Sequence, residues 1–166
     1  MKSKMKIVII VLLIIAALPL IIGLFLPNER IFTKTALFKS SPQQIWEVIT
    51  DIKGQEAWRS DVKSIEMIHT QKGAEKWTEI PKKGKPITFQ VKAYQPPNRF
   101  DIEIVESDFS GYWEGRFEEN HGGTKVELKE VAIVKNPYFR TLAYLFFDLN
   151  QTMDLYLANL KTKLGE

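Results

Sequence analysis

Residues 40–51, SSPQQIWEVITD, carry the most specific local signal for the fold. Ser41 suits a helix N-cap, Pro42 suits the first helical position, and Gln44 stands where a capping box places its second member. The apolar residues that follow recur at helical spacing: Ile45, Val48, Ile49 and Ile52. The stretch therefore predicts a short, capped helix with one apolar face.

Strand-like segments surround this helix. Residues 31–39 read as a strand before it, and after residue 62 the chain changes to short alternating runs. Turn residues separate these runs at 81–86, 95–98 and 120–123. We expect consecutive antiparallel strands near residues 62–70, 75–80, 87–94, 100–104, 113–117 and 126–134.

A long closing helix is predicted over residues 138–163. Its apolar stripe alternates spacings of three and four residues: Phe139, Leu142, Phe146, Leu149, Met153, Tyr156, Leu160 and Leu164. A coiled-coil seam has the same pattern, but a single helix after a run of strands favours covering a sheet. Further apolar residues lie beside the stripe, which indicates either burial on several sides or a patch for a bilayer or a partner: Tyr144, Leu145, Phe147, Leu155 and Leu157.

The order of these elements, with residues 40–51 and Trp58 as its local motifs, resembles the START/Bet v 1-like (SRPBCC) superfamily, in its polyketide cyclase/dehydrase-like branch. The resemblance covers residues 30–164. It implies an α+β helix-grip fold, in which a curved antiparallel sheet of about seven strands wraps a long C-terminal helix. It also implies a cavity for a lipid or another hydrophobic small molecule. It implies no particular reaction and carries over no catalytic residues, because this fold has many functions.

Residues 7–26, IVIIVLLIIAALPLIIGLFL, contain no charged side chain. At about 1.5 Å per residue this helix would be roughly 30 Å long, the thickness of a bilayer core. A cleaved signal peptide is the alternative, but no small-residue cleavage site follows Leu26. We expect a basic tail (1–6), a transmembrane helix (7–26), a short linker (27–30) and the helix-grip domain (31–166). The lysines of the tail favour a cytoplasmic N-terminus and an extracytoplasmic domain.

The charge of the chain excludes one class of partner. The whole chain has 23 Lys+Arg and 20 Asp+Glu, and the basic tail holds three of the lysines, which leaves 20 against 20 beyond it. A nearly neutral domain lacks the basic surface of a nucleic-acid binder. There is no cysteine, and the two histidines fall on different predicted elements, so we expect neither a metal site nor a cofactor. The oligomeric state is not predicted.

Glu130 is the most informative candidate site residue. It alternates in phase with Val126 and Leu128, so its side chain should point inward. A buried carboxyl group must be paired, protonated or in contact with water, and the candidate cations are Arg59 and Arg116. A shift in register would instead turn it outward.

The other candidate ligand-binding residues are Arg59 and large aromatic side chains at predicted inner positions: Trp58, Trp77, Phe89, Phe100, Trp113, Phe117 and Phe146. Aromatic residues line hydrophobic cavities, but they also fill packed cores. Three functions stay open. The leading hypothesis is a membrane-anchored binding module for a hydrophobic ligand. The alternatives are a cyclase/dehydrase-like enzyme that uses Glu130 and an interaction domain without a cavity.

Overall fold

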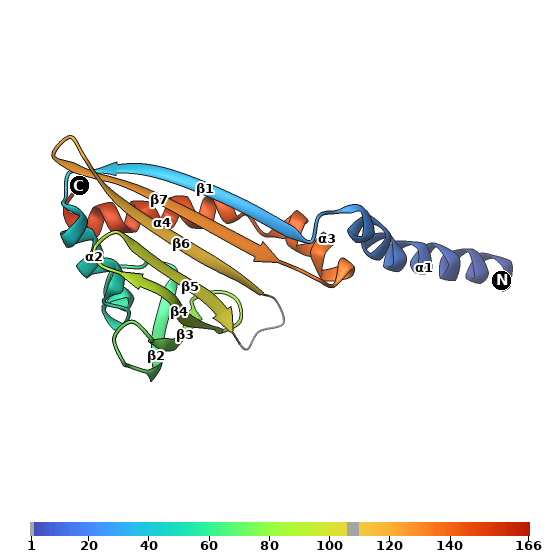
Figure 1. Cartoon of the computed structure of the whole chain (residues 1–166). Coiled ribbons are helices and arrows are strands. Elements are labelled where there is room, and N and C mark those ends of the chain that lie inside the picture. The colour runs from blue at the N-terminus through green and yellow to red at the C-terminus, as the bar shows by residue number, and fades with distance from the viewer. Residues whose placement is uncertain (1, 106–109) are drawn as a thin grey trace. The chain divides into compact units, whose positions relative to one another are not determined.

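The computed structural model describes residues 2–105 and 110–166. The chain divides into two compact units, one formed by the residues up to Arg30 with Ile133–Asp148, the other by Ile31–Ala132 with Leu149–Glu166. In chain order (Figure 1) the elements are α1 (Lys2–Phe25), β1 (Glu29–Phe38), α2 (Pro42–Thr50), the 3-10 helix η1 (Lys53–Ala57), β2 (Val62–His69), β3 (Lys76–Pro81), β4 (Ile87–Gln95), β5 (Arg99–Val105), β6 (Ser110–Asn120), β7 (Gly123–Ile133), α3 (Pro137–Phe146) and α4 (Leu149–Leu164).

The strands form one seven-stranded sheet in the order β1-β7-β6-β5-β4-β3-β2. The pairs from β2 to β6 are antiparallel, as the sequence predicts. The hairpin between β6 and β7 turns at His121 and Gly122, whose φ angles of 47° and 84° are both positive. A positive φ at both central residues is typical of a tight hairpin turn, which explains the predicted turn at 120–123.

Helix α2 begins with the capping box expected from residues 40–51. The Ser41 hydroxyl accepts a hydrogen bond from the Gln44 amide at 3.3 Å, and the Ser41 amide donates to the Gln44 side chain at 2.9 Å. The apolar face of the helix is buried in the core through Ile45, Trp46 and Ile49. The capped start therefore fixes where the chain leaves β1 and covers one end of the sheet.

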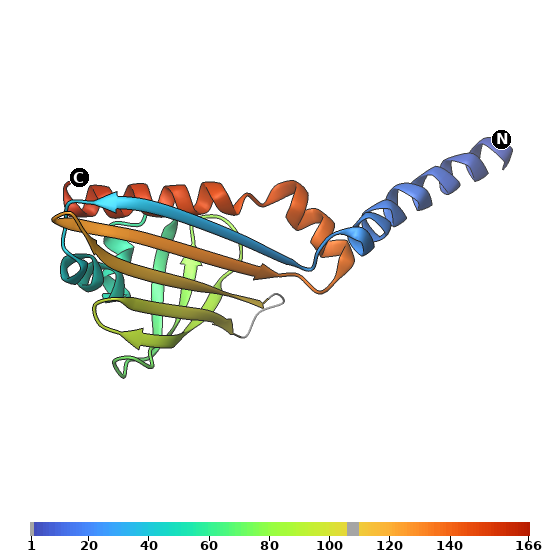
Figure 2. The ribbon, with the colours of Figure 1, turned by 45° about the horizontal axis from the view of Figure 1, so that its top comes forward.

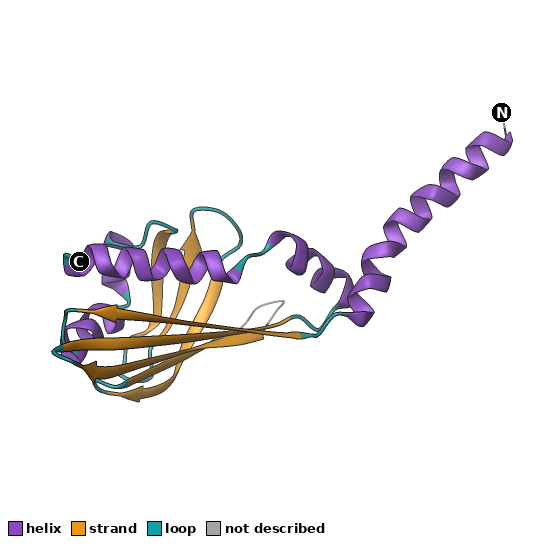
Figure 3. Cartoon of the chain, turned by 90° about the horizontal axis from the view of Figure 1, so that it is seen from above, coloured by secondary structure: helices purple, strands orange, loops and turns teal. Residues whose placement is uncertain are grey.

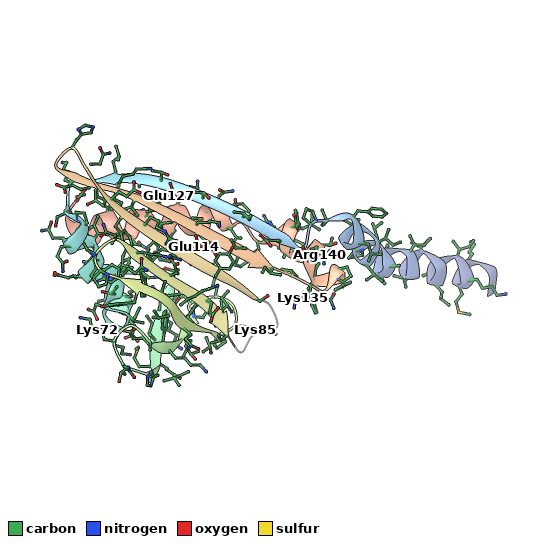
Figure 4. All side chains as sticks on the ribbon, viewed as in Figure 1. Lys72, Lys85, Glu114, Glu127, Lys135 and Arg140 are labelled. Atoms are coloured by element: carbon green, nitrogen blue, oxygen red, sulfur yellow. The ribbon has the colours of Figure 1, made fainter. Side chains whose placement is uncertain are left out.

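Helix α4 lies along one face of the sheet (Figures 2 and 3) and buries Met153, Leu157 and Leu160 in the same core. The other face carries charged side chains, among them Glu114 and Glu127 (Figure 4). There Asp101 is almost fully buried beneath Arg99 and Arg116, with which it forms ion pairs. This division between an apolar and a charged face is the helix-grip architecture that the sequence predicts.

The prediction of one continuous helix over residues 138–163 is wrong. The chain forms α3 and α4, separated at Phe147, whose backbone is extended (φ −121°, ψ 108°). Arg30 donates to the carbonyl oxygens of Ala143 and Phe147, and so satisfies acceptors at the end of α3. Asp148 precedes α4 and belongs to the residue types that favour a new helix start. The apolar residues keep their helical spacing through this region, so the sequence pattern gives no indication of the break.

Helix α1 belongs to the first unit. Its segment Lys4–Phe25 is long and apolar enough to cross a membrane, judged by length and composition. Most of its apolar side chains are exposed, for example Leu12 and Ile15 at about 60%. Such a helix fits a membrane span or a signal anchor.

Candidate functional site

The inner face of the sheet is defined by the strand register. Ile102 on β5 pairs with Val91 on β4 and with Trp113 on β6, while Phe89 pairs with Ile104. One end of this face is a packed core. There Trp46 from α2 makes edge-to-face contacts with Tyr94, Phe100 and Phe117 at centroid distances of 4.9, 6.0 and 6.3 Å.

Toward the other end of the inner face, aromatic side chains remain partly exposed. Trp58, Phe89 and Trp113 are only partly buried, although they pack against the core. The Tyr156 ring of α4 lies between two of them, 5.6 Å from Trp58 and 6.0 Å from Trp113. Solvent therefore reaches aromatic side chains that point toward the helix, as expected where a ligand could replace that solvent.

Arg59 lies at this end of the inner face, where it contacts hydrogen-bond acceptors and an aromatic ring. Its guanidinium donates to Glu79 at 2.8 Å, Asp61 at 2.7 Å and Gln55 at 3.1 Å, and its carbon lies 5.5 Å from the Tyr156 ring centroid. Burial alone would lower the pKa of Arg59, but the negative charges of Glu79 and Asp61 more than offset this and raise it. The arginine is therefore a permanent cation whose charge is already compensated.

Glu130 contributes a partly buried carboxyl group to the site. Its side chain is partly buried, and burial raises its pKa to about 7, although the charge of Arg59 acts in the opposite direction. Within residues 2–105 and 110–166 it forms no hydrogen bond and no ion pair. Near neutral pH the group is therefore close to half protonated, and it can either donate or accept a hydrogen bond.

Two tyrosine hydroxyls also lack partners. Burial raises the pKa of Tyr156, against the opposing effect of Arg59, so this phenol stays neutral and can donate. Neither its hydroxyl nor that of Tyr94, which is fully buried, forms a hydrogen bond to any other residue that the structure describes. Among the described residues only the Tyr94 hydroxyl is both fully buried and without a hydrogen-bond partner, and its ring lies at the packed end, 4.9 Å from that of Trp46.

The candidate residues separate into three groups. Trp77, Phe100 and Phe117 are almost fully buried, with Trp77 stacked on Phe89 at 5.7 Å, so these three are packed core. Around Tyr156 the structure brings together Trp58, Arg59 and Trp113. Glu130 is close enough to Arg59 to interact with its charge, and Phe89 is a partly buried residue of the same inner face.

Two candidates lie elsewhere. Phe146 is 79% exposed on α3 in the first unit, and Arg116, considered as a partner of Glu130, bonds to Asp101 instead. Sequence reasoning missed the roles of Tyr156 and Glu79. Their signals were a hydroxyl within the apolar stripe of the last helix and a carboxylate in phase with Trp77 on a strand.

A profile of the family described as "Polyketide cyclase / dehydrase and lipid transport" matches residues 29–165. No curated protein matches the chain in sequence.

Among solved structures, the di-domain ARO/CYC BexL from the BE-7585A biosynthetic pathway has a TM-score of 0.69 at 11% identity, covering 85% of this chain and 52% of that chain. This chain thus spans about half of that protein. The Zhui aromatase/cyclase from Streptomyces sp. R1128 has a TM-score of 0.67 at 12% identity, covering 81% and 93%. A norcoclaurine synthase from Thalictrum flavum, in complex with a transition-state analogue, has a TM-score of 0.67 at 9% identity, covering 82% and 95%. At these identities the likeness establishes the fold alone, which is the helix-grip fold implied by the resemblance.

Proposed function

Since this chain belongs to the polyketide cyclase/dehydrase and lipid transport family, we propose that it is a membrane-anchored binding module for a hydrophobic small molecule or lipid. The ligand would lie between the sheet and α4, at the end where Trp58, Phe89 and Trp113 are only partly buried. One observation carries the proposal: the carboxyl of Glu130, which has no hydrogen-bond or ion-pair partner among the described residues, lies in this aromatic, partly accessible interior. A ligand that brings one polar group would satisfy it.

The charges of the site favour a ligand whose polar end is neutral. Arg59 contributes one positive charge, whereas Asp61 and Glu79 contribute one negative charge each, so the cluster is net negative before Glu130 ionises. At about 6 Å and an effective dielectric of about 20, one such charge disfavours an anionic head group by about 2–3 kcal/mol. A hydroxyl or carbonyl group avoids this cost and can bond to Glu130 and Tyr156. The proposed ligand is therefore an alcohol or ketone with an apolar body rather than a free fatty acid.

Helix α1 would hold the domain at a membrane. Its apolar segment has the length of a span, and Lys2, Lys4 and Lys6 before it favour a cytoplasmic N-terminus. The domain would then be extracytoplasmic and close to a bilayer. Alkaline carbonate extraction tests the anchor, which should stay with the membrane pellet. Protease treatment of intact cells tests the orientation, since the domain should be cleaved from outside.

A matched pair of fluorescent ligands tests the binding site. The full chain in detergent micelles is titrated with a dansyl-labelled undecanol and with the corresponding undecanoic acid. We expect saturable binding with at least about tenfold preference for the alcohol at pH 8, where the carboxyl groups are ionised. Non-saturable partition of both probes, identical with and without protein, would refute the proposal.

Glu130 also supports an enzymatic alternative. A carboxyl group whose pKa is raised to about 7 can accept and return a proton near neutral pH, as cyclisation and dehydration require. Tyr156, whose phenol stays neutral, would then donate a hydrogen bond to the reacting group. Turnover of an aromatic polyketide mimic that disappears in Glu130→Gln, while the variant still binds the dansyl alcohol, would favour this alternative. Binding without turnover in the unaltered chain would favour the binding module over the enzyme.

A further inference from the structure

Helix α3 exposes an unusual amount of apolar surface. We define the α3 apolar face as the exposed large side chains of α3 and of Phe147, which directly follows it: Tyr138, Phe139, Leu145, Phe146 and Phe147. Leu145 is 67% exposed and Phe146 79%. A contiguous apolar patch of this kind on a folded protein marks a contact with another surface.

The helix is fastened to the C-terminal part of α1 within the same unit. Thr141, which is almost fully buried, donates from its hydroxyl to the Pro19 carbonyl at 2.6 Å. Arg140 donates to the carbonyls of Gly23 and Leu26 at 2.8 and 3.0 Å. Gly23 permits this approach, because a Cβ there would stand 1.8 Å from the Pro137 carbonyl oxygen.

This attachment sets the depth of α3. Pro19 precedes Leu26, the last residue of the apolar segment, by a length of helix of about 10 Å at 1.5 Å per residue. Interfacial amphipathic helices lie about 5–10 Å deep in the boundary between head groups and acyl chains. We infer that α3 is an interfacial helix, and that its apolar face inserts into the lipid leaflet in which α1 ends. The inference rests on the membrane anchor of the proposed function.

The ends of α3 suit such a position. At its start the Asn136 side chain accepts from the amides of Tyr138 and Phe139, and at its end Arg30 donates to the Ala143 and Phe147 carbonyls. Backbone groups bonded in this way cost less to remove from water.

Cationic side chains lie on α3 and next to it. Arg140 and Lys135 lie beside the start of α3 (Figure 4), and Arg30 stacks on the Tyr144 ring at 4.4 Å. Cations and aromatic rings at this level are typical of a protein surface at the head groups, especially those of anionic lipids. The bilayer is therefore the occupant that fits this face.

The absence of cysteine allows a direct depth measurement. Single cysteines at Phe146, Ile15 and Lys72, in the full chain, are labelled with NBD and reconstituted into phosphatidylcholine/phosphatidylglycerol vesicles. The lipids carry bromine either near the head group or near the chain end. We expect the Phe146 probe to be quenched mainly by the shallow bromine and the Ile15 probe by the deep one. The Lys72 probe, on an exposed loop of the other unit, should not be quenched.

The quenching pattern distinguishes insertion of α3 from membrane anchoring by α1. Quenching at Ile15 without quenching at Phe146 would overturn the inference and leave the anchor, whereas no quenching at either would overturn both. A blue-shifted but unquenched Phe146 probe would mean that protein covers this face, which also overturns it. Gly23→Val should push α3 away from α1 and lower quenching at Phe146 but not at Ile15. Unchanged quenching at Phe146 would refute the attachment as the cause of depth.

Discussion

The replacement Glu130→Gln should change how the stability of the fold depends on pH. Burial raises the pKa of Glu130 in the folded chain to about 7, from an ordinary value of 4.5. The folded state therefore binds this proton more tightly than the unfolded state. The stabilising effect is complete below pH 4.5 and is lost as the pH rises toward 7. A shift of this size corresponds to about 3 kcal/mol.

Glutamine resembles the protonated carboxyl group and does not titrate. The variant should therefore match the unaltered chain near pH 4.5 and be more stable at pH 8, by up to about 3 kcal/mol or about 10 °C in Tm. Thermal unfolding of the full chain in detergent, followed by tryptophan fluorescence, measures this difference. All four tryptophans lie in the unit that contains Glu130.

A control on the same strand separates this effect from general loss of charge. Glu127, whose side chain is 46% exposed, lies on the charged face of β7, so Glu127→Gln should shift Tm by little at either pH. Parallel Tm curves for the Glu130→Gln variant and the unaltered chain from pH 4.5 to 8 would refute the argument that Glu130 is held in the interior.

Three further replacements test the packing, each by the same thermal unfolding. Arg59→Met should lower the stability by about 3 kcal/mol, because it removes the cation that compensates the buried Glu79 carboxylate. Arg59→Met with Glu79→Leu should recover most of this loss, and no recovery would contradict the pairing. Gly123→Ala should cost more than about 2 kcal/mol, because its Cβ would stand 2.1 Å from the Phe38 carbonyl oxygen, and an unchanged Tm would be inconsistent with that contact. Ser41→Ala should cost about 1 kcal/mol through the lost cap of α2, and a stability equal to that of the unaltered chain would speak against the capping box.

The sequence predicts much of the fold because its local signals agree with one another. The Ser41 cap and the turn at His121 each depend on a few adjacent residues, and the structure contains both. The break at Phe147 could not be predicted in this way. It involves Arg30, which lies far away in the chain, and no proline or glycine marks it.

The candidate site was predictable in composition but not in its contacts. Alternation along β7 places Glu130 with Val126 and Leu128, yet it does not predict that Val131, of opposite phase, is also buried. The choice between packed core and accessible lining depends on how closely α4 approaches each strand. Periodicity contains no such information, so Trp77 and Trp113 looked equivalent in the sequence and differ in the structure.

Native mass spectrometry of the full chain measures whether a ligand occupies the space between the sheet and α4. The full chain, released from detergent micelles after exposure to a lipid extract, is compared with Ile102→Trp and Glu103→Trp. Ile102 lies on the inner face beside Trp113, so a larger side chain there should fill the proposed binding space, whereas Glu103 points to the charged face. We predict one bound molecule per unaltered chain. This bound molecule should be retained in Glu103→Trp and lost in Ile102→Trp. No bound molecule, or equal binding in both folded variants, would contradict it.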